Sequence, residues 1–262
     1  MRGSWMLVAA AGLTLAGCGG SDEAAPPVVD VRGDEYAYVM PERIEGGVVT
    51  MRFTNTGEEL HEYALARLDA GKTRADVDAF LADPASLEGG PPDWIEDVGG
   101  VPTLSQGEEV SITRELSSGT YALLCFVPAP DGRPHIAHGM VQTFEVGEAG
   151  EAELPEPDAV VTATDEGFEI PELEVGEQTL ELRNGAAVPR EFYLYSPNPG
   201  VTLAEVEEWG EGGFEGEPLA TFLGAMQSIP PGTSVFLTVD LEAGERYVFF
   251  DEELREEEFS VG

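Results

Sequence analysis

Basic residues are scarce in this chain: 13 Lys and Arg stand against 51 Asp and Glu, the formal net charge is −38, and Lys72 is the only lysine. Such a charge repels phosphate backbones and anionic lipid headgroups, so nucleic acid and polybasic membrane contacts are excluded. An acidic surface almost without lysine is typical of halophilic adaptation, since salt screens the self-repulsion. The same acidity also suits the docking of a basic redox partner, and both interpretations stay open.

Long apolar runs are nearly absent, and Met6 to Ala16 is too short to span a bilayer as a mature helix. After the positive Arg2, this run predicts a signal segment at residues 1–17. Its end, Leu15-Ala16-Gly17-Cys18, resembles a bacterial lipobox, so we expect lipid on Cys18 and a polar tether over residues 18–29. The alternative is an ordinary secretory signal. The expected location is the cell membrane, lipid-anchored, facing the periplasm or the cell exterior.

Cysteine and histidine are rare as well, with two cysteines and three histidines in the whole chain. Once Cys18 carries lipid, Cys125 is left alone and no intramolecular disulfide can form. A leftover cysteine in an exported protein is a reactive thiol, an intermolecular bridge or a metal ligand.

An internal repeat is the main guide to the organisation of the chain. Residues 38–55 recur at 168–184, 61–65 at 190–194 and 73–80 at 202–209. In the last pair a threonine stands three residues before an acidic residue, the spacing of a helix capping box. Each half is therefore expected to carry one short helix.

Alternating apolar positions in short runs between turn signals fill the rest of each half and predict antiparallel strands. Residues 148–157 are rich in Glu, Ala and Pro and are typical of a linker. We therefore predict an all-β protein with one β-sandwich at residues 30–147 and a second at residues 158–262.

A cluster of chemically distinctive residues follows the strand that ends near Cys125. His135, His138 and Met140 lie in the same loop, and His61 begins an upstream strand. This order resembles the cupredoxin family of type 1 copper proteins, and the His135-x4-Met140 ending looks most like the copper loop of copper nitrite reductases. The resemblance implies two tandem cupredoxin-like Greek-key sandwiches, each with a short helical insertion, and electron transfer as the activity.

The same resemblance implies a copper site with His61, Cys125 and His135 in the equatorial plane and Met140 as the axial ligand. A thiolate, two imidazoles and a weak thioether suit copper, whereas zinc rarely takes methionine. The spacing favours His135 over His138, because His138 leaves one residue before Met140. Taken singly, each of these residues is as readily a core or surface side chain.

The second half lacks these ligands. Arg190 stands at the position of His61, Asp251 stands at that of Cys125, and the loop is shorter. We therefore expect one copper per chain, in the first domain. The type 2 copper of nitrite reductases needs further histidines that this chain does not have.

Electron transfer to an unidentified redox partner protein, without a catalytic centre, is thus the leading hypothesis. Two alternatives stay open: a copper-binding or delivery protein without redox turnover, and a metal-free cupredoxin-like interaction module. Two departures from the family concern the surroundings of the site. Glu62 stands where many blue copper proteins have asparagine, and residues 72–100 form a long insertion that can cover the site or present an interface.

Overall fold

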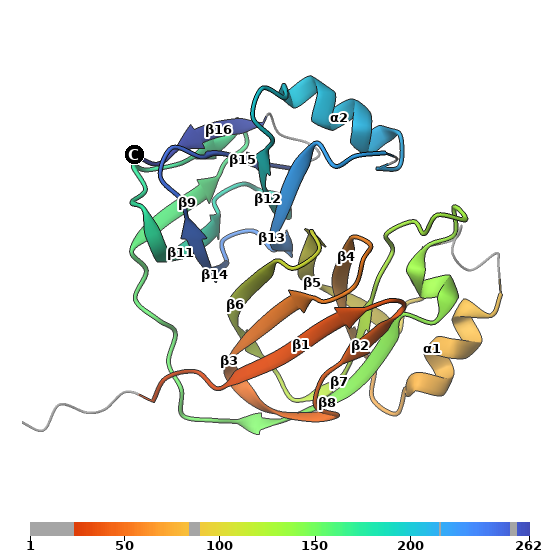
Figure 1. The fold of residues 1–262 in the computed structure, drawn as a ribbon. Coiled ribbons are helices and arrows are strands. Elements are labelled where there is room, and N and C mark those ends of the chain that lie inside the picture. Colours follow the sequence, from red (N-terminus) through yellow and green to blue (C-terminus); the bar gives the residue numbers. More distant parts are fainter. Residues whose placement is uncertain (1–23, 84–89, 215, 252–255) are drawn as a thin grey trace, which may run out of the picture.

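The computed structural model describes residues 24–83, 90–214, 216–251 and 256–262, so the predicted signal segment and the lipidation site Cys18 lie outside the described residues. The described chain is mostly strand, with two short α-helices, α1 (Arg74–Leu81) and α2 (Leu203–Glu211) (Figure 1). Neither of these helices is long and apolar enough to cross a membrane.

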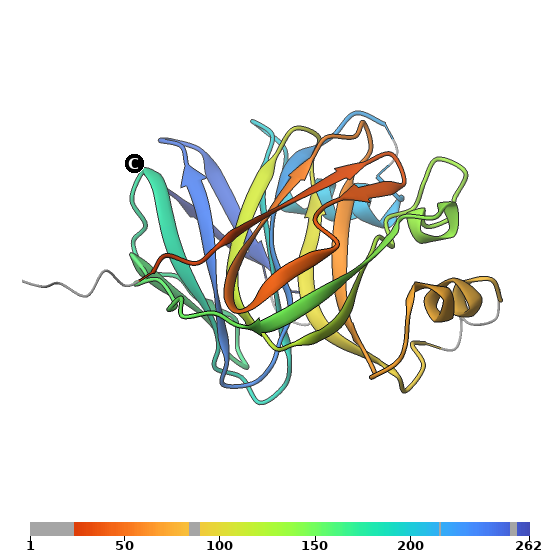
Figure 2. The ribbon, with the colours of Figure 1, turned by 90° about the horizontal axis from the view of Figure 1, so that it is seen from below.

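Two sheet layers run through both halves of the chain (Figure 2). The first layer has the strand order β2-β1-β3-β6-β14-β11-β9-β10. Its strands are β1 (Val28–Asp34), β2 (Ala37–Val39), β3 (Arg43–Asn55), β6 (Glu109–Leu116), β9 (Ala159–Ala163), β10 (Phe168–Glu169), β11 (Gly176–Asn184) and β14 (Ser234–Leu241). The halves meet in this layer through the antiparallel pair β6 and β14.

The second layer has the order β8-β7-β4-β5-β13-β12-β15-β16. Its strands are β4 (His61–Leu68), β5 (Ile95–Leu104), β7 (Gly119–Leu124), β8 (Val141–Ala149), β12 (Arg190–Pro197), β13 (Ala220–Ile229), β15 (Arg246–Phe250) and β16 (Glu257–Ser260). Here the halves meet through β5 and β13. The start of β3 also pairs with β8, which ties the two layers together at that edge.

The strand pairing repeats between the halves. The parallel pair β1 and β3 has its counterpart in β9 and β11, and the antiparallel pair β4 and β7 has its counterpart in β12 and β15. One buried apolar cluster nevertheless runs through both halves, from Phe53 and Leu123 to Leu180 and Phe249. Because the halves share both layers and this cluster, the division into two sandwiches at residues 30–147 and 158–262 stays a prediction.

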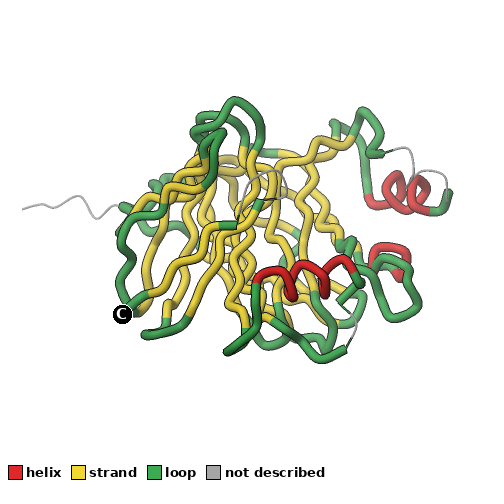
Figure 3. Tube along the Cα trace, turned by 90° about the horizontal axis from the view of Figure 1, so that it is seen from above, coloured by secondary structure: helices red, strands yellow, loops and turns green. Residues whose placement is uncertain are grey.

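Each helix begins at a capping box. The Thr73 N–H donates to the Asp76 carboxylate at 2.9 Å, and the Thr202 N–H donates to the Glu205 carboxylate at 2.8 Å. These bonds satisfy backbone donors that the first helical turn leaves free. The helices lie outside the sheets (Figure 3), where Val77 of α1 packs on the outer face of β4 and β7.

Candidate metal centre

Strand geometry brings the first two predicted ligands together. His61 is the first residue of β4, and Cys125 follows directly after β7. The two strands are antiparallel neighbours with Ala64 opposite Leu124, so the start of one lies beside the end of the other. His135 opens the short 3₁₀ helix η1 (His135–His138), and Met140 precedes β8. His61, Cys125, His135 and Met140 are all fully buried.

Backbone hydrogen bonds hold the loop between β7 and β8 in place. The His135 N–H donates to Val127 O at 2.9 Å, and the Ile136 N–H donates to Cys125 O at 2.8 Å. The Met140 N–H in turn donates to His135 O at 3.1 Å. These bonds hold the backbone in place at the three loop positions Cys125, His135 and Met140.

Three donor atoms converge inside this loop. The Nδ1 atoms of His61 and His135 are 3.1 Å apart, and Cys125 Sγ is 3.4 Å from His135 Nδ1. The ligand atoms of the three residues all lie within 4.8 Å of one another. Two imidazole nitrogens bound to one ion at about 120° lie about 3.5 Å apart. The observed spacing is close to this value, and two imidazoles with a thiolate suit copper, so the residues fit the metal.

Glu59 and Tyr36, which no sequence pattern indicated, position His135 through its outer nitrogen, Nε2. His135 Nε2 lies 2.8 Å from Glu59 Oε2, and the Tyr36 hydroxyl donates to the other oxygen of Glu59 at 3.1 Å. A carboxylate on the outer nitrogen keeps the proton there and turns the Nδ1 lone pair inward, as in carboxylate–histidine–metal arrangements. Glu59 and His135 are 76 residues apart, so no local spacing indicates this pair.

The third histidine, His138, stays outside the group of converging donors. Its Nε2 lies 3.1 Å from Asp131 Oδ1, its ring stacks on Tyr36 at 4.7 Å between centroids, and its side chain is 22% exposed. The structure therefore brings His61, Cys125 and His135 together and places His138 at the rim.

His61 is enclosed tightly enough to require a glycine beside it. A Cβ atom at Gly57 would lie 2.5 Å from His61 Nε2, closer than any real contact, so a side chain there would displace the imidazole. Among the described residues His61 Nε2 has no hydrogen-bond partner. Packing around Nε2 and the contact of Nδ1 with His135 Nδ1 at 3.1 Å together orient the buried ring, with Nδ1 facing the other donors.

Burial keeps these groups uncharged in the absence of a metal. Burial, and then the neighbouring His135, lower the pKa of His61 to about 4, and burial lowers the pKa of His135 against the opposing effect of Glu59. Burial, and then the Glu62 carboxylate, raise the pKa of the Cys125 thiol to about 12. A cation bound between them would favour the thiolate and the neutral imidazoles.

Glu62 links the loop that follows Cys125 to the second half of the chain. Its carboxylate accepts the Phe126 N–H at 2.9 Å and the amide of Gln227, on β13, at 3.4 Å. Burial raises the pKa of Glu62. The position that carries asparagine in many blue copper proteins is therefore occupied by a carboxyl group that also fixes the residue after Cys125.

An ion pair replaces the donor group in the second half. Tyr193 pairs with Phe250 as Ala64 pairs with Leu124, so Arg190 and Asp251 stand at the positions of His61 and Cys125. Arg190 Nη1 lies 3.6 Å from Asp251 Oδ1, and both side chains are buried. The Asp251 carboxylate also accepts the Glu191 N–H at 2.7 Å. Opposite charges thus fill the space that the two ligands occupy in the first half.

No family model matches the sequence, and no curated protein matches it. Among solved structures, the reduced auracyanin of Roseiflexus castenholzii is 21% identical with a TM-score of 0.32, covering 47% of this chain and 99% of that one. Auracyanin A of Chloroflexus aurantiacus, a blue copper protein, is 23% identical with a TM-score of 0.33, covering 47% and 100%. A multicopper oxidase is 14% identical with a TM-score of 0.27, covering 90% and 88%. With TM-scores this low, the copper assignment depends on the donor atoms themselves.

Proposed function

We propose that this protein is a type 1 copper protein of the cupredoxin kind that transfers electrons outside the cytoplasm while anchored to a membrane by lipid on Cys18. One observation carries the copper assignment: the Nδ1 atoms of His61 and His135 and the Sγ of Cys125 converge, fully buried, from the start of β4 and the loop between β7 and β8. Such a donor set suits copper better than zinc, and the buried thioether of Met140 follows His135 by five residues.

In the proposed activity, the protein keeps the copper ligands in a fixed arrangement. Copper would supply the change of oxidation state. His61, Cys125 and His135 would hold it, Glu59 would fix the His135 ring, and Glu62 would fix the backbone after the cysteine. A site whose ligands barely move between oxidation states suits rapid electron exchange.

We propose an electron carrier and not an oxidase because the chain has three histidines in all. Two of them already belong to the converging group, and a further copper centre would need several more imidazoles. The acidic surface suits a basic redox partner protein or a saline medium, and the lipobox-like Leu15-Ala16-Gly17-Cys18 supports the membrane anchor.

Copper(II) titration of the metal-free full chain, followed by visible absorption, tests the copper site. We expect an intense thiolate-to-copper charge-transfer band that saturates at one copper per chain. Cys125→Ser and His135→Ala should abolish the band. The matched control is His138→Ala, which should keep it because His138 lies outside the donor group. A colourless product, or a band that survives Cys125→Ser, would remove the type 1 assignment.

A further inference from the structure

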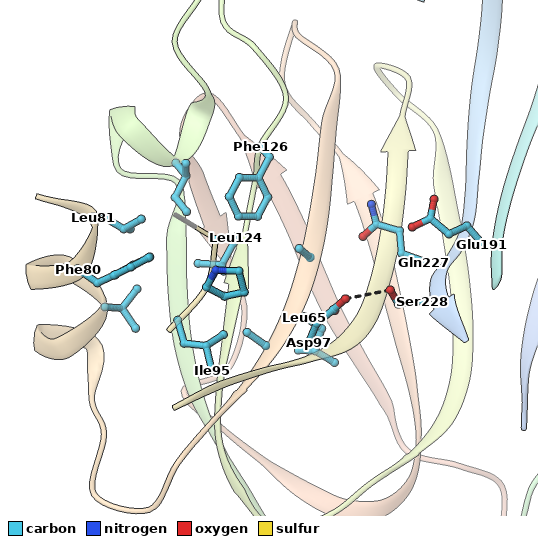
Figure 4. Close-up of a pocket in the computed structure, with 16 residues that line it drawn as sticks. Leu65, Phe80, Leu81, Ile95, Asp97, Leu124, Phe126, Glu191, Gln227 and Ser228 are labelled. Atoms are coloured by element: carbon cyan, nitrogen blue, oxygen red, sulfur yellow. Dashed lines mark hydrogen bonds between the residues drawn. The ribbon is translucent and has the colours of Figure 1, made fainter. Parts of the chain in front are cut away.

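Each half of the chain has a pocket between its helix and the outer face of the second layer. The pocket under α1, of about 370 Å³, lies beside β4, β5 and β7, and Figure 4 shows Leu81, Ile95 and Leu124 in its wall. The pocket under α2, of about 870 Å³, lies beside β12, β13 and β15. Since these strands are counterparts in the repeat, the two pockets occupy equivalent places, yet their linings differ.

Aromatic side chains line the pocket under α2 at positions where the first half has smaller ones. The register of the paired strands puts Tyr193 at the position of Ala64, and Phe250 at the position of Leu124. In all, five aromatic residues line the pocket: Tyr193, Tyr195, Phe214, Phe222 and Phe250. Tyr195 is buried, whereas the other four are half-buried, so part of each of these four rings is accessible to an occupant.

The charged part of this lining is acidic. Three carboxylate residues line the pocket, Glu207 and Glu211 of α2 and Glu256 before β16, and none of its described lining residues is basic. Arg246, on the neighbouring strand β15, lies outside the lining and is paired with Glu258 at 2.7 Å. The local charge and the net charge of −38 therefore both favour a cation over a neutral or anionic occupant.

Ring faces and carboxylates together select the kind of cation. The faces of tyrosine and phenylalanine rings attract a cation that comes within about 6 Å of the ring centre. A primary ammonium group is strongly hydrated and needs hydrogen-bond acceptors in place of water, which ring faces do not supply. A quaternary ammonium group has no N–H to satisfy, so it leaves water for an aromatic wall without losing a hydrogen bond.

We propose that the pocket under α2 binds a small quaternary ammonium compound, with its head against the aromatic rings and beside the carboxylates of Glu207 and Glu256. The volume of about 870 Å³ is that of a small-molecule site and leaves room for a substituent on the head. The three carboxylates disfavour a phosphate next to the head, so a free cation is favoured over the headgroup of a phosphocholine lipid. This site lies in the half without copper ligands and does not depend on the proposed copper site.

Calorimetric titration of the metal-free full chain with choline tests the proposal. Sodium chloride at about 0.5 M shortens the Debye length to about 4 Å, which suppresses nonspecific attraction of cations to the acidic surface. We expect saturable binding at one site per chain. The neutral isostere 3,3-dimethylbutan-1-ol, in which carbon replaces the ammonium nitrogen, should bind at least about tenfold more weakly. Phosphocholine, with an anionic phosphate next to the same head, should also bind more weakly than choline.

Two variants test the aromatic wall by installing the residue that the first half has at the equivalent position. Phe250→Leu should weaken choline binding at least about threefold through the loss of one ring, and Tyr193→Ala serves if that variant does not fold. Phe126→Leu is the matched control, because this ring is 45% exposed and lies outside the pocket under α2, so choline binding should be unaltered. Absence of saturable binding, equal binding of the neutral isostere, tighter binding of phosphocholine, or unchanged binding in a folded wall variant would overturn the proposal.

Discussion

Acid should destabilise the metal-free protein through His61. Its pKa in the folded state is about 4, below the ordinary value of 6.5, because the ring is buried and His135 lies beside it. As the pH falls below about 6.5, His61 becomes protonated in the unfolded chain but stays unprotonated in the folded chain. The contribution of the uncharged His61 to stability is therefore fully present above the pKa of the unfolded chain. It is lost as the pH falls toward the pKa of the folded chain.

Between about pH 7.5 and about pH 5, protonation of His61 in the unfolded chain lowers the free energy of unfolding by about 1–2 kcal/mol. The lower pH stays above the isoelectric point of about 4.1, so the chain keeps its negative charge. The carboxylates add their own pH dependence, so the His61 contribution has to be isolated as a difference between variants.

Urea denaturation of the metal-free full chain at both pH values measures it. Wild type should lose about 1–2 kcal/mol more than His61→Gln between the two conditions. His138→Gln is the matched control, because His138 lies at the rim with part of its side chain exposed, and it should behave like wild type. If His61→Gln is as acid-sensitive as wild type, the pKa of His61 is not lowered in the folded state, and the reasoning from its burial is wrong.

Three further predictions concern other residues. Arg190→Leu or Asp251→Leu alone should destabilise the protein by about 3–5 kcal/mol, because each single change leaves a buried charge behind. The double variant should be destabilised by less than the sum of the two, which a double-mutant cycle followed by urea denaturation measures. Glu59→Ala should keep the copper band but weaken copper affinity about 10–100-fold by freeing the His135 ring, which a competitive chelator titration would detect. Cys18→Ala should release the protein from the membrane fraction, and retention would point to a protein anchor.

The sequence by itself carries the local features. Alternating apolar residues predict the strands, and the spacing of Thr73 to Asp76 and of Thr202 to Glu205 predicts the helix starts that the structure contains. The order of cysteine, histidine and methionine in one loop also gives the candidate ligands, through its resemblance to the cupredoxin family. The strands and the helix starts depend on neighbours along the chain, which is why spacing alone indicates them.

Tertiary structure alone decided how the halves join and what surrounds the site. The pairing of β5 with β13 and of β6 with β14 is made by backbone groups, which leave no side-chain signature in the sequence. Glu59 reaches His135 across 76 residues. The pocket under α1 lies where the described residues of a helix and three strands leave space between them. Contacts of this kind depend on the packing of distant segments, and no local pattern encodes them.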